Sequence, residues 1–248
     1  MNSSTESMIA RDVAWSPVNG HGFELASIYY NEQFQLISID GEILGVDNDL
    51  PFSAGYHILC YPNWELKEVR VSYSRSANEQ SSSSATLLRS KEGQWTDHLR
   101  HPLPQFDGFT DVDISLTPLT NTLPIRRLNL QVGEARDINV LFFEAPLLIP
   151  KPARQRYTCL EKRDDGGLYR LDWEEINFTV DIPVDADGLV LDAWRRRPVG
   201  KRLTEVLPTV TLAHCDLAGG ERCPEQGGRG LCRGQDGSCR EAALGPVA

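Results

Sequence analysis

Hydrophobic and polar residues alternate one by one in several parts of the chain, and this period of two residues constrains the fold more than any other feature. Between residues 69 and 74, two valines and a tyrosine alternate with an arginine and two serines, and residues 178–182 repeat the pattern. Successive side chains of a β-strand point to opposite faces, so the pattern predicts strands with one buried and one exposed face. No segment has strong helical periodicity.

The predicted strands are short and are separated by frequent turns. They lie at residues 23–30, 34–39, 55–61, 69–74, 86–89, 137–143, 155–160, 168–172 and 178–182. After the last of these, Asp187-Gly188 is a hairpin signal. One short helix is predicted at residues 123–128, where Pro124 is acceptable in the first turn. These elements predict a mainly β fold, with a closed or rolled antiparallel sheet and no β-α-β units.

The chain is acidic, with a formal net charge of -10. Nonspecific nucleic-acid binding needs a basic surface, so this charge argues against a nucleic-acid partner, and it also disfavours docking on an anionic membrane. The first residues lack the basic and apolar regions of a signal peptide, and no apolar run approaches the ~20 residues of a membrane span. We therefore expect a cytoplasmic protein without stable membrane insertion, in which Cys60 and Cys159 are reduced and buried.

Composition divides the chain into three parts. We expect a flexible N-terminus at residues 1–12, one β domain at residues 13–195 and a disordered tail at residues 196–248. Beyond about Thr211, glycines multiply and aromatic residues disappear, so the tail cannot bury enough apolar surface to offset chain entropy. Within the domain, the serine-rich segment Ser74–Ala85 is predicted to be a polar loop between strands.

The segment from Thr117 to Leu128 fits neither a plain strand nor a plain helix. Its neutral polar side chains belong to Thr117, Thr120, Asn121 and Thr122. Such groups bind sugar hydroxyls well, because they donate and accept hydrogen bonds without a fixed charge. They also cap helices and satisfy the backbone of turns, so a structural role is the alternative.

Charged residues lie on both sides of this segment. Asp111 and Asp113 share one face of a predicted strand, and Arg126 and Arg127 lie in the predicted helix. Paired carboxylates can act as acid and base where their surroundings separate their pKa values. Alternatively, the two carboxylates form ion pairs with the two arginines and hold the segment on the sheet.

A further candidate lies at residues 154–158. In a strand, Arg154 and Arg156 share one face, while Gln155 and Tyr157 share the other. The arginines here and in the predicted helix could clamp a phosphate or carboxylate group. Because the two faces of a strand cannot line one pocket, at least half of this motif is packed or faces solvent.

Taken together, the segments 107–128, 154–158 and 185–192 resemble the putative glycolipid-binding family, from about Trp15 to about Asp192. The resemblance implies that residues 13–195 form one long antiparallel sheet, curled into a β-roll or half-barrel around one short helix. A concave sheet of this kind would supply apolar side chains for an acyl tail, and the polar groups of the central segment would orient a head group. The chain departs from the family at Ala193-Trp194, where the family has a tyrosine after its last strand.

Other motifs are weaker. His98 and His101 lie near Asp97, but this segment is predicted to be a loop and no further ligand is evident. The tail cysteines are separated by six to eight residues, whereas zinc knuckles separate their ligands by two to four; they are Cys215, Cys223, Cys232 and Cys239. The basic run at residues 194–202 favours a solvated chain end. No motif for a nucleophile, a nucleotide or another cofactor is present.

We therefore predict a protein that binds an amphipathic small molecule, such as a glycolipid, without catalysing a reaction. One alternative is a hydrolase acting on a glycoconjugate, in which Glu24 and Asp172 could act with Asp111. Another is a module that binds proteins through an exposed sheet edge. No catalytic residue, cofactor or metal ligand is predicted, and the predicted ligand-binding residues are Asp111, Asp113, Thr117, Thr120, Asn121, Thr122, Arg126, Arg127, Arg154 and Tyr157.

Overall fold

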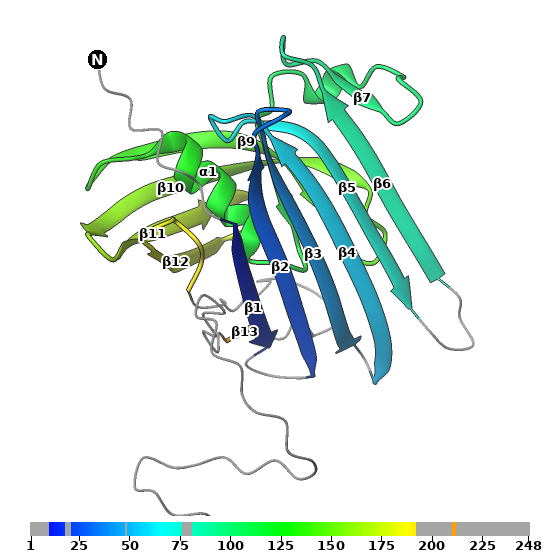
Figure 1. Ribbon diagram of the computed structural model, residues 1–248, viewed down its shortest axis with the longest axis horizontal. Helices are drawn as coiled ribbons and strands as arrows, with labels where there is room; N and C mark the ends of the chain where they lie inside the picture. Colours follow the sequence, from blue (N-terminus) through cyan, green and yellow to red (C-terminus); the bar gives the residue numbers. More distant parts are fainter. Residues whose placement is uncertain (1–9, 18–20, 48, 76–80, 192–209, 212–248) are drawn as a thin grey trace, which may run out of the picture. The chain divides into compact units, whose positions relative to one another are not determined.

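The structure is a computed structural model, and it describes residues 10–17, 21–47, 49–75, 81–191 and 210–211. Eight of its strands form one antiparallel sheet in the order β13-β1-β2-β3-β4-β5-β6-β7, and Figure 1 shows β1 to β6 side by side. Their bounds are β1 Arg11–Pro17, β2 Gly22–Asn31, β3 Leu36–Asp47, β4 Leu50–Cys60, β5 Leu66–Arg75, β6 Ser81–Arg89, β7 Trp95–Asp97 and β13 Val210–Thr211.

A second sheet has five strands in the order β12-β11-β10-β9-β8. Its strands are antiparallel except for β8 and β9, which pair in parallel. The strand bounds are β8 Asp111–Ile114, β9 Ala135–Phe143, β10 Pro150–Arg163, β11 Gly166–Trp173 and β12 Phe178–Asp185. The remaining elements are η1 Pro104–Phe106, η2 Leu119–Asn121, α1 Thr122–Leu128 and η3 Glu174–Ile176. The predicted mainly β fold with one short α-helix is confirmed, and its strands are divided between two sheets.

The alternating pattern has the predicted effect in β5. Val69, Val71 and Tyr73 are buried, while Arg70 and Ser72 are exposed. Strand β9 differs, because Val140 and Phe142 pack in one hydrophobic cluster and Leu141 and Phe143 in another. A strand buried on both faces has a continuous apolar run, which is what residues 140–143 show.

The prediction of a polar loop at Ser74–Ala85 is wrong for most of that segment. Ser74 is in β5, and the serines from Ser81 onward are in β6. Ser74 pairs with Ser82, and Ser72 pairs with Ser84. These serines face outward from the sheet, where solvent accepts polar side chains, so a strand forms without the apolar residues that normally mark one. Residues 76–80 lie outside the described part of the chain.

The predicted ends of the domain are only partly described. Strand β1 begins at Arg11, so Arg11 and Asp12 of the predicted N-terminus are in a strand. Of the predicted tail, Val210 and Thr211 are described, and they pair with β1. The basic run at residues 194–202 and the four tail cysteines lie outside the described residues.

Two hydrophobic clusters fill the described domain. The first lies between the inner face of the eight-stranded sheet and β8 and β9, and the second lies on β9 to β12. Helix α1 contributes to both, because Leu123 packs in the first cluster and Ile125 in the second. The predicted buried cysteines are confirmed, since Cys60 and Cys159 are buried, free thiols.

Candidate functional site

Asp111 of β8 is fully buried and accepts three hydrogen bonds. Arg127 donates from Nε to Oδ1 at 3.1 Å and from Nη2 to Oδ2 at 2.5 Å, and Thr110 Oγ1 donates to Oδ2 at 2.7 Å. The predicted ion pair between the carboxylates and arginines of the central segment is therefore present at Asp111. It joins the end of α1 to the first strand of the five-stranded sheet.

Asp113 contacts side chains of η2 and β10. Gln155 Nε2 donates to its Oδ2 at 2.7 Å, and Thr120 Oγ1 lies 3.4 Å from its Oδ1. Tyr157 donates from its hydroxyl to Asn121 Oδ1 at 2.8 Å. All five side chains are buried, so this network fastens η2 to β8 and β10 from the inside.

The other predicted arginines lie apart from one another. The Arg126 guanidinium lies 5.1 Å from the ring centroid of Trp64, a distance that permits a cation–π interaction. Arg154 is exposed on β10 and pairs with Asp137 at 3.2 Å. Arg127 is committed to Asp111, so the three arginines do not converge on one point.

The contacts of the predicted residues give most of them a structural role. Seven of the ten are buried, and these are Asp111, Asp113, Thr117, Thr120, Asn121, Thr122 and Tyr157. Six of these seven make the side-chain hydrogen bonds described in this section. Ligand binding by the ten residues stays a prediction.

A third polar cluster contains Glu24 of β2, Tyr56 of β4 and Thr117. The Tyr56 hydroxyl and Thr117 Oγ1 each donate to Glu24 Oε1 at 2.6 Å. Gly41 on β3 makes this possible, because a Cβ there would lie 2.0 Å from the Tyr56 ring. The ring therefore crosses the glycine and brings its hydroxyl to β2.

Glu24 has unused hydrogen-bonding capacity inside the protein. Its side chain is 3% exposed, and Oε2 has no hydrogen-bond partner in the described part of the chain. Burial raises the pKa of this carboxyl from 4.5 to about 7, although the hydrogen bonds from Thr117 and Tyr56 lower it. Among the described residues, Thr122 Oγ1 is also buried without a partner.

The alternation of residues 23–30 gave no signal for this carboxyl. A period of two places Phe23 and Leu25 on one face and Glu24 on the other, and hydrophobicity alone would bury the first two. The structure buries Glu24 and leaves Phe23 and Leu25 exposed. Asp172, the other carboxylate considered for a hydrolase, accepts a hydrogen bond from Thr179 at 2.6 Å.

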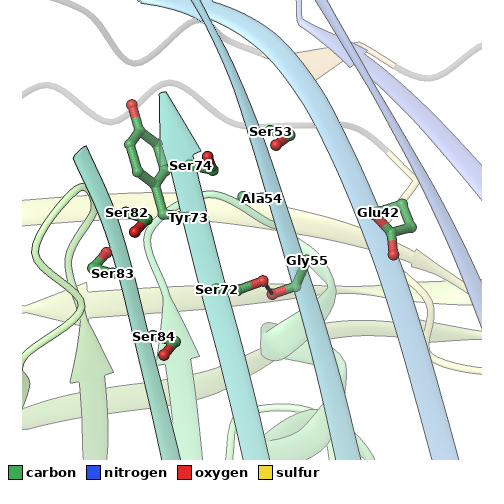
Figure 2. A pocket seen from close by; sticks show the side chains of 10 residues that line it. All are labelled: Glu42, Ser53, Ala54, Gly55, Ser72, Tyr73, Ser74, Ser82, Ser83 and Ser84. Atoms are coloured by element: carbon green, nitrogen blue, oxygen red, sulfur yellow. Dashed lines mark hydrogen bonds between the residues drawn. The ribbon is translucent and has the colours of Figure 1, made fainter. Parts of the chain in front are cut away.

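The outer face of the eight-stranded sheet carries a pocket of about 320 Å³ that is lined mainly by hydroxyl groups. Figure 2 shows its side chains on β3 to β6. Its lining residues are Glu42, Ser53, Ala54, Gly55, Ser72, Tyr73, Ser74, Ser82, Ser83 and Ser84. We call it the hydroxyl pocket. Among the described lining residues, Glu42 has the only charged side chain, so the pocket offers a ligand many neutral donors and acceptors.

Strand register places exposed apolar side chains beside the hydroxyl pocket. Leu44 pairs with Phe23 of β2 on one side and with Ser53 on the other. Phe23 is 47% exposed, Leu25 45% and Leu44 62%. We call these three residues the apolar patch. The patch and the pocket therefore occupy adjacent strands on one face of the sheet.

His98 and His101 do not form a metal site with Asp97 in the arrangement described. His101 Nδ1 lies 2.9 Å from Asp97 Oδ2, and the Asp97 carboxylate also accepts the backbone N–H groups of Leu99 and His101. Across the described residues, no group of three or more His, Cys, Asp or Glu side chains is arranged to hold a metal ion. No helix in this part of the chain is long and apolar enough to cross a membrane.

Comparisons with known proteins agree with the fold. A family model described as putative glycolipid-binding matches residues 12–196. The crystal structure of a DUF1089 family protein from Pseudomonas aeruginosa is similar, with a TM-score of 0.58 and 30% sequence identity. The similarity covers 73% of this chain and 92% of that one. A search of curated proteins gave no match.

Proposed function

Because the chain belongs to the putative glycolipid-binding family, we propose that it binds an amphipathic molecule with a hydroxyl-rich head group on the outer face of its eight-stranded sheet. The observation that carries the proposal is the position of the hydroxyl pocket beside the apolar patch. A sugar head group would exchange hydrogen bonds with the serines, and the apolar part of the ligand would cover Phe23, Leu25 and Leu44. Binding of this kind needs no chemical step.

The packing of the inner face of the same sheet supports a binding site on the outer face. The inward side chains Ile39, Ile58 and Val69 are completely buried in a cluster that also holds Leu119 and Leu123. Apolar surface that already contacts the protein's own core gains nothing further from an acyl chain. A ligand can therefore gain from apolar contact only where apolar side chains are exposed to water, as they are in the apolar patch.

A short-chain neutral glycolipid tests the proposal in solution. Dihexanoyl glucosyl-diacylglycerol, used below its micelle concentration, should bind the protein in isothermal titration calorimetry. Leu44→Ser should weaken binding about tenfold, because part of a leucine side chain contributes ~1–2 kcal/mol when it is covered. Leu147→Ser is the matched control, since Leu147 is 70% exposed in the loop between β9 and β10. No binding by the parent protein, or equal losses in both variants, would refute the proposal.

Hydrolysis of a glycoconjugate is the second candidate, and Glu24 is the observation that favours it. A carboxyl group with a pKa of about 7 is suited to donate a proton as a general acid near neutral pH. The test is an assay for sugar release from glucosyl-diacylglycerol and aryl glycosides. Activity that disappears in a folded Glu24→Gln variant would establish the hydrolase, and no release in the parent protein would exclude these substrates.

A further inference from the structure

A second pocket adjoins the hydroxyl pocket on the outer face of the large sheet. It has a volume of about 370 Å³ and lies where β5 and β6 meet the loop after β7. Arg70 pairs with Thr86 across these strands, one step along from the pair Ser72–Ser84 of the hydroxyl pocket. Side chains two residues apart on a strand share a face and are separated by ~7 Å. The pocket is lined by Glu68, Arg70, Thr86, Leu88, His98 and Arg100.

The two carboxylates around this second pocket already accept hydrogen bonds from other groups. Glu68 accepts a hydrogen bond from Arg70 Nε at 2.5 Å. At the end of β7, the Asp97 carboxylate contacts the His101 ring and accepts two backbone N–H groups. Neither of these two described carboxylates forms an ion pair with Arg100.

Arg100 is the cation of this pocket that has no side-chain partner among the described residues. Within the described part of the chain, its guanidinium forms no ion pair, hydrogen bond or ring contact. Every other described arginine contacts a carboxylate, a backbone carbonyl or an aromatic ring. His98 lines the same pocket, and its ring likewise makes no hydrogen bond or ion pair with a described residue. An uncompensated arginine is notable in a chain with a net charge of -10.

We propose that the second pocket binds an anionic oxygen group on the head of the ligand. This inference rests on the proposed function, and it specifies the ligand as an amphipathic molecule whose hydroxylated head carries a phosphate, sulfonate or carboxylate. The Arg100 guanidinium supplies donors that suit such a group. Arg70, the Thr86 hydroxyl and the His98 ring add donors around it. The sugar hydroxyls of the same head group then lie over the serines one step further along β5 and β6.

Two lipids that differ in one substituent test this inference. Dihexanoyl sulfoquinovosyl-diacylglycerol has the glucose ring of the neutral lipid with a sulfonate in place of one hydroxyl. The parent protein should bind it about tenfold more tightly than dihexanoyl glucosyl-diacylglycerol at low salt. The Arg100→Gln variant should lose most of this preference and keep its affinity for the neutral lipid. Arg163→Gln is the control, because Arg163 is exposed and pairs with Glu161 on the other sheet.

The outcomes separate this inference from the proposed function. Equal affinity of the parent protein for the two lipids overturns the inference and leaves the proposed function standing. Failure of both lipids to bind overturns both. An equal loss in Arg163→Gln and Arg100→Gln means that overall charge causes the preference, which also overturns the inference. Added salt should reduce the preference in the parent protein, because it screens an exposed guanidinium.

Discussion

Asp111 and Glu24 are two carboxyl groups buried to nearly the same degree in very different surroundings. Asp111 has a cation, Arg127, and three hydrogen bonds shared between both of its oxygens. Glu24 has two neutral hydroxyl donors on one oxygen, and its other oxygen has no hydrogen-bond partner among the described residues. The difference shows that burial alone does not decide how a carboxyl group affects stability. Its hydrogen-bond and ion-pair partners also determine the free-energy cost of its charged form.

The largest effect should come from removing the cation of the first carboxyl. Arg127→Ala leaves Asp111 buried and unpaired, and breaking such a pair costs about 3–5 kcal/mol. Chemical denaturation measures the loss in the free energy of unfolding. Arg170→Ala is the control, since its ion pair with Asp181 is exposed and should cost at most about 1 kcal/mol. Similar losses in the two variants would show that the buried Asp111 pair contributes no more to stability than an exposed pair.

Glu24 should make stability depend on pH near neutrality. Its pKa is raised in the folded protein, so its contribution to stability is complete below the unfolded value of 4.5 and is lost as pH rises through about 7. A shift of this size corresponds to a loss on the order of 3 kcal/mol. Glu24→Gln, which cannot ionise, should remove this part of the pH dependence. Parallel pH profiles of unfolding for the variant and the parent would contradict the assignment.

Tyr56 provides a finer test of the second carboxyl. Tyr56→Phe removes one of the two donors to Glu24 Oε1, which should cost about 1–2 kcal/mol. The hydrogen bond from Tyr56 lowers the pKa of Glu24, so the pH transition should also move upward in the variant. Denaturation midpoints measured across pH 5 to 9 report both effects. A stability loss without a change in the pH transition would show that the Tyr56 hydroxyl does not influence the pKa of Glu24.

The smallest effect is expected at the Thr122 hydroxyl, another buried group without a hydrogen-bond partner among the described residues. Thr122→Val removes a hydroxyl that makes no hydrogen bond among the described residues, and it preserves the shape of the side chain. The free energy of unfolding should change by less than about 0.5 kcal/mol. Thr117→Val is the contrast, because it removes a donor to Glu24. A large loss in Thr122→Val would reveal an interaction of this hydroxyl.

The sequence predicted the strands that alternate apolar and polar residues, because burial of one strand face requires an apolar residue at every second position. The helix at α1 and the ion pair at Asp111 also followed from residue types and spacing. Residues 86–89 of β6 were predicted as a strand, but its first part at residues 81–85 was missed, because those residues are serines and one alanine. The sequence did not indicate the partners Gln155 and Thr120 of Asp113, because they come from elements whose proximity only the fold defines.

The candidate site was harder to predict than the fold. The hydroxyl pocket depends on the register of four neighbouring strands, and no single segment of sequence carries that information. Glu24 was considered as a carboxylate, but hydrophobicity places it on the wrong face of β2. The apolar patch was hidden for the same reason, because an exposed Phe23 or Leu44 looks like a core residue in the sequence.

Helix α1 couples the unfolding of the two sheets. Its side chains Leu123 and Ile125 are two residues apart, yet they belong to different hydrophobic clusters. If either sheet separated, one side of the helix would be uncovered, and a helix of seven residues does not persist in water without packing. Its loss would open the remaining cluster to solvent. The domain should therefore melt in one cooperative transition rather than sheet by sheet.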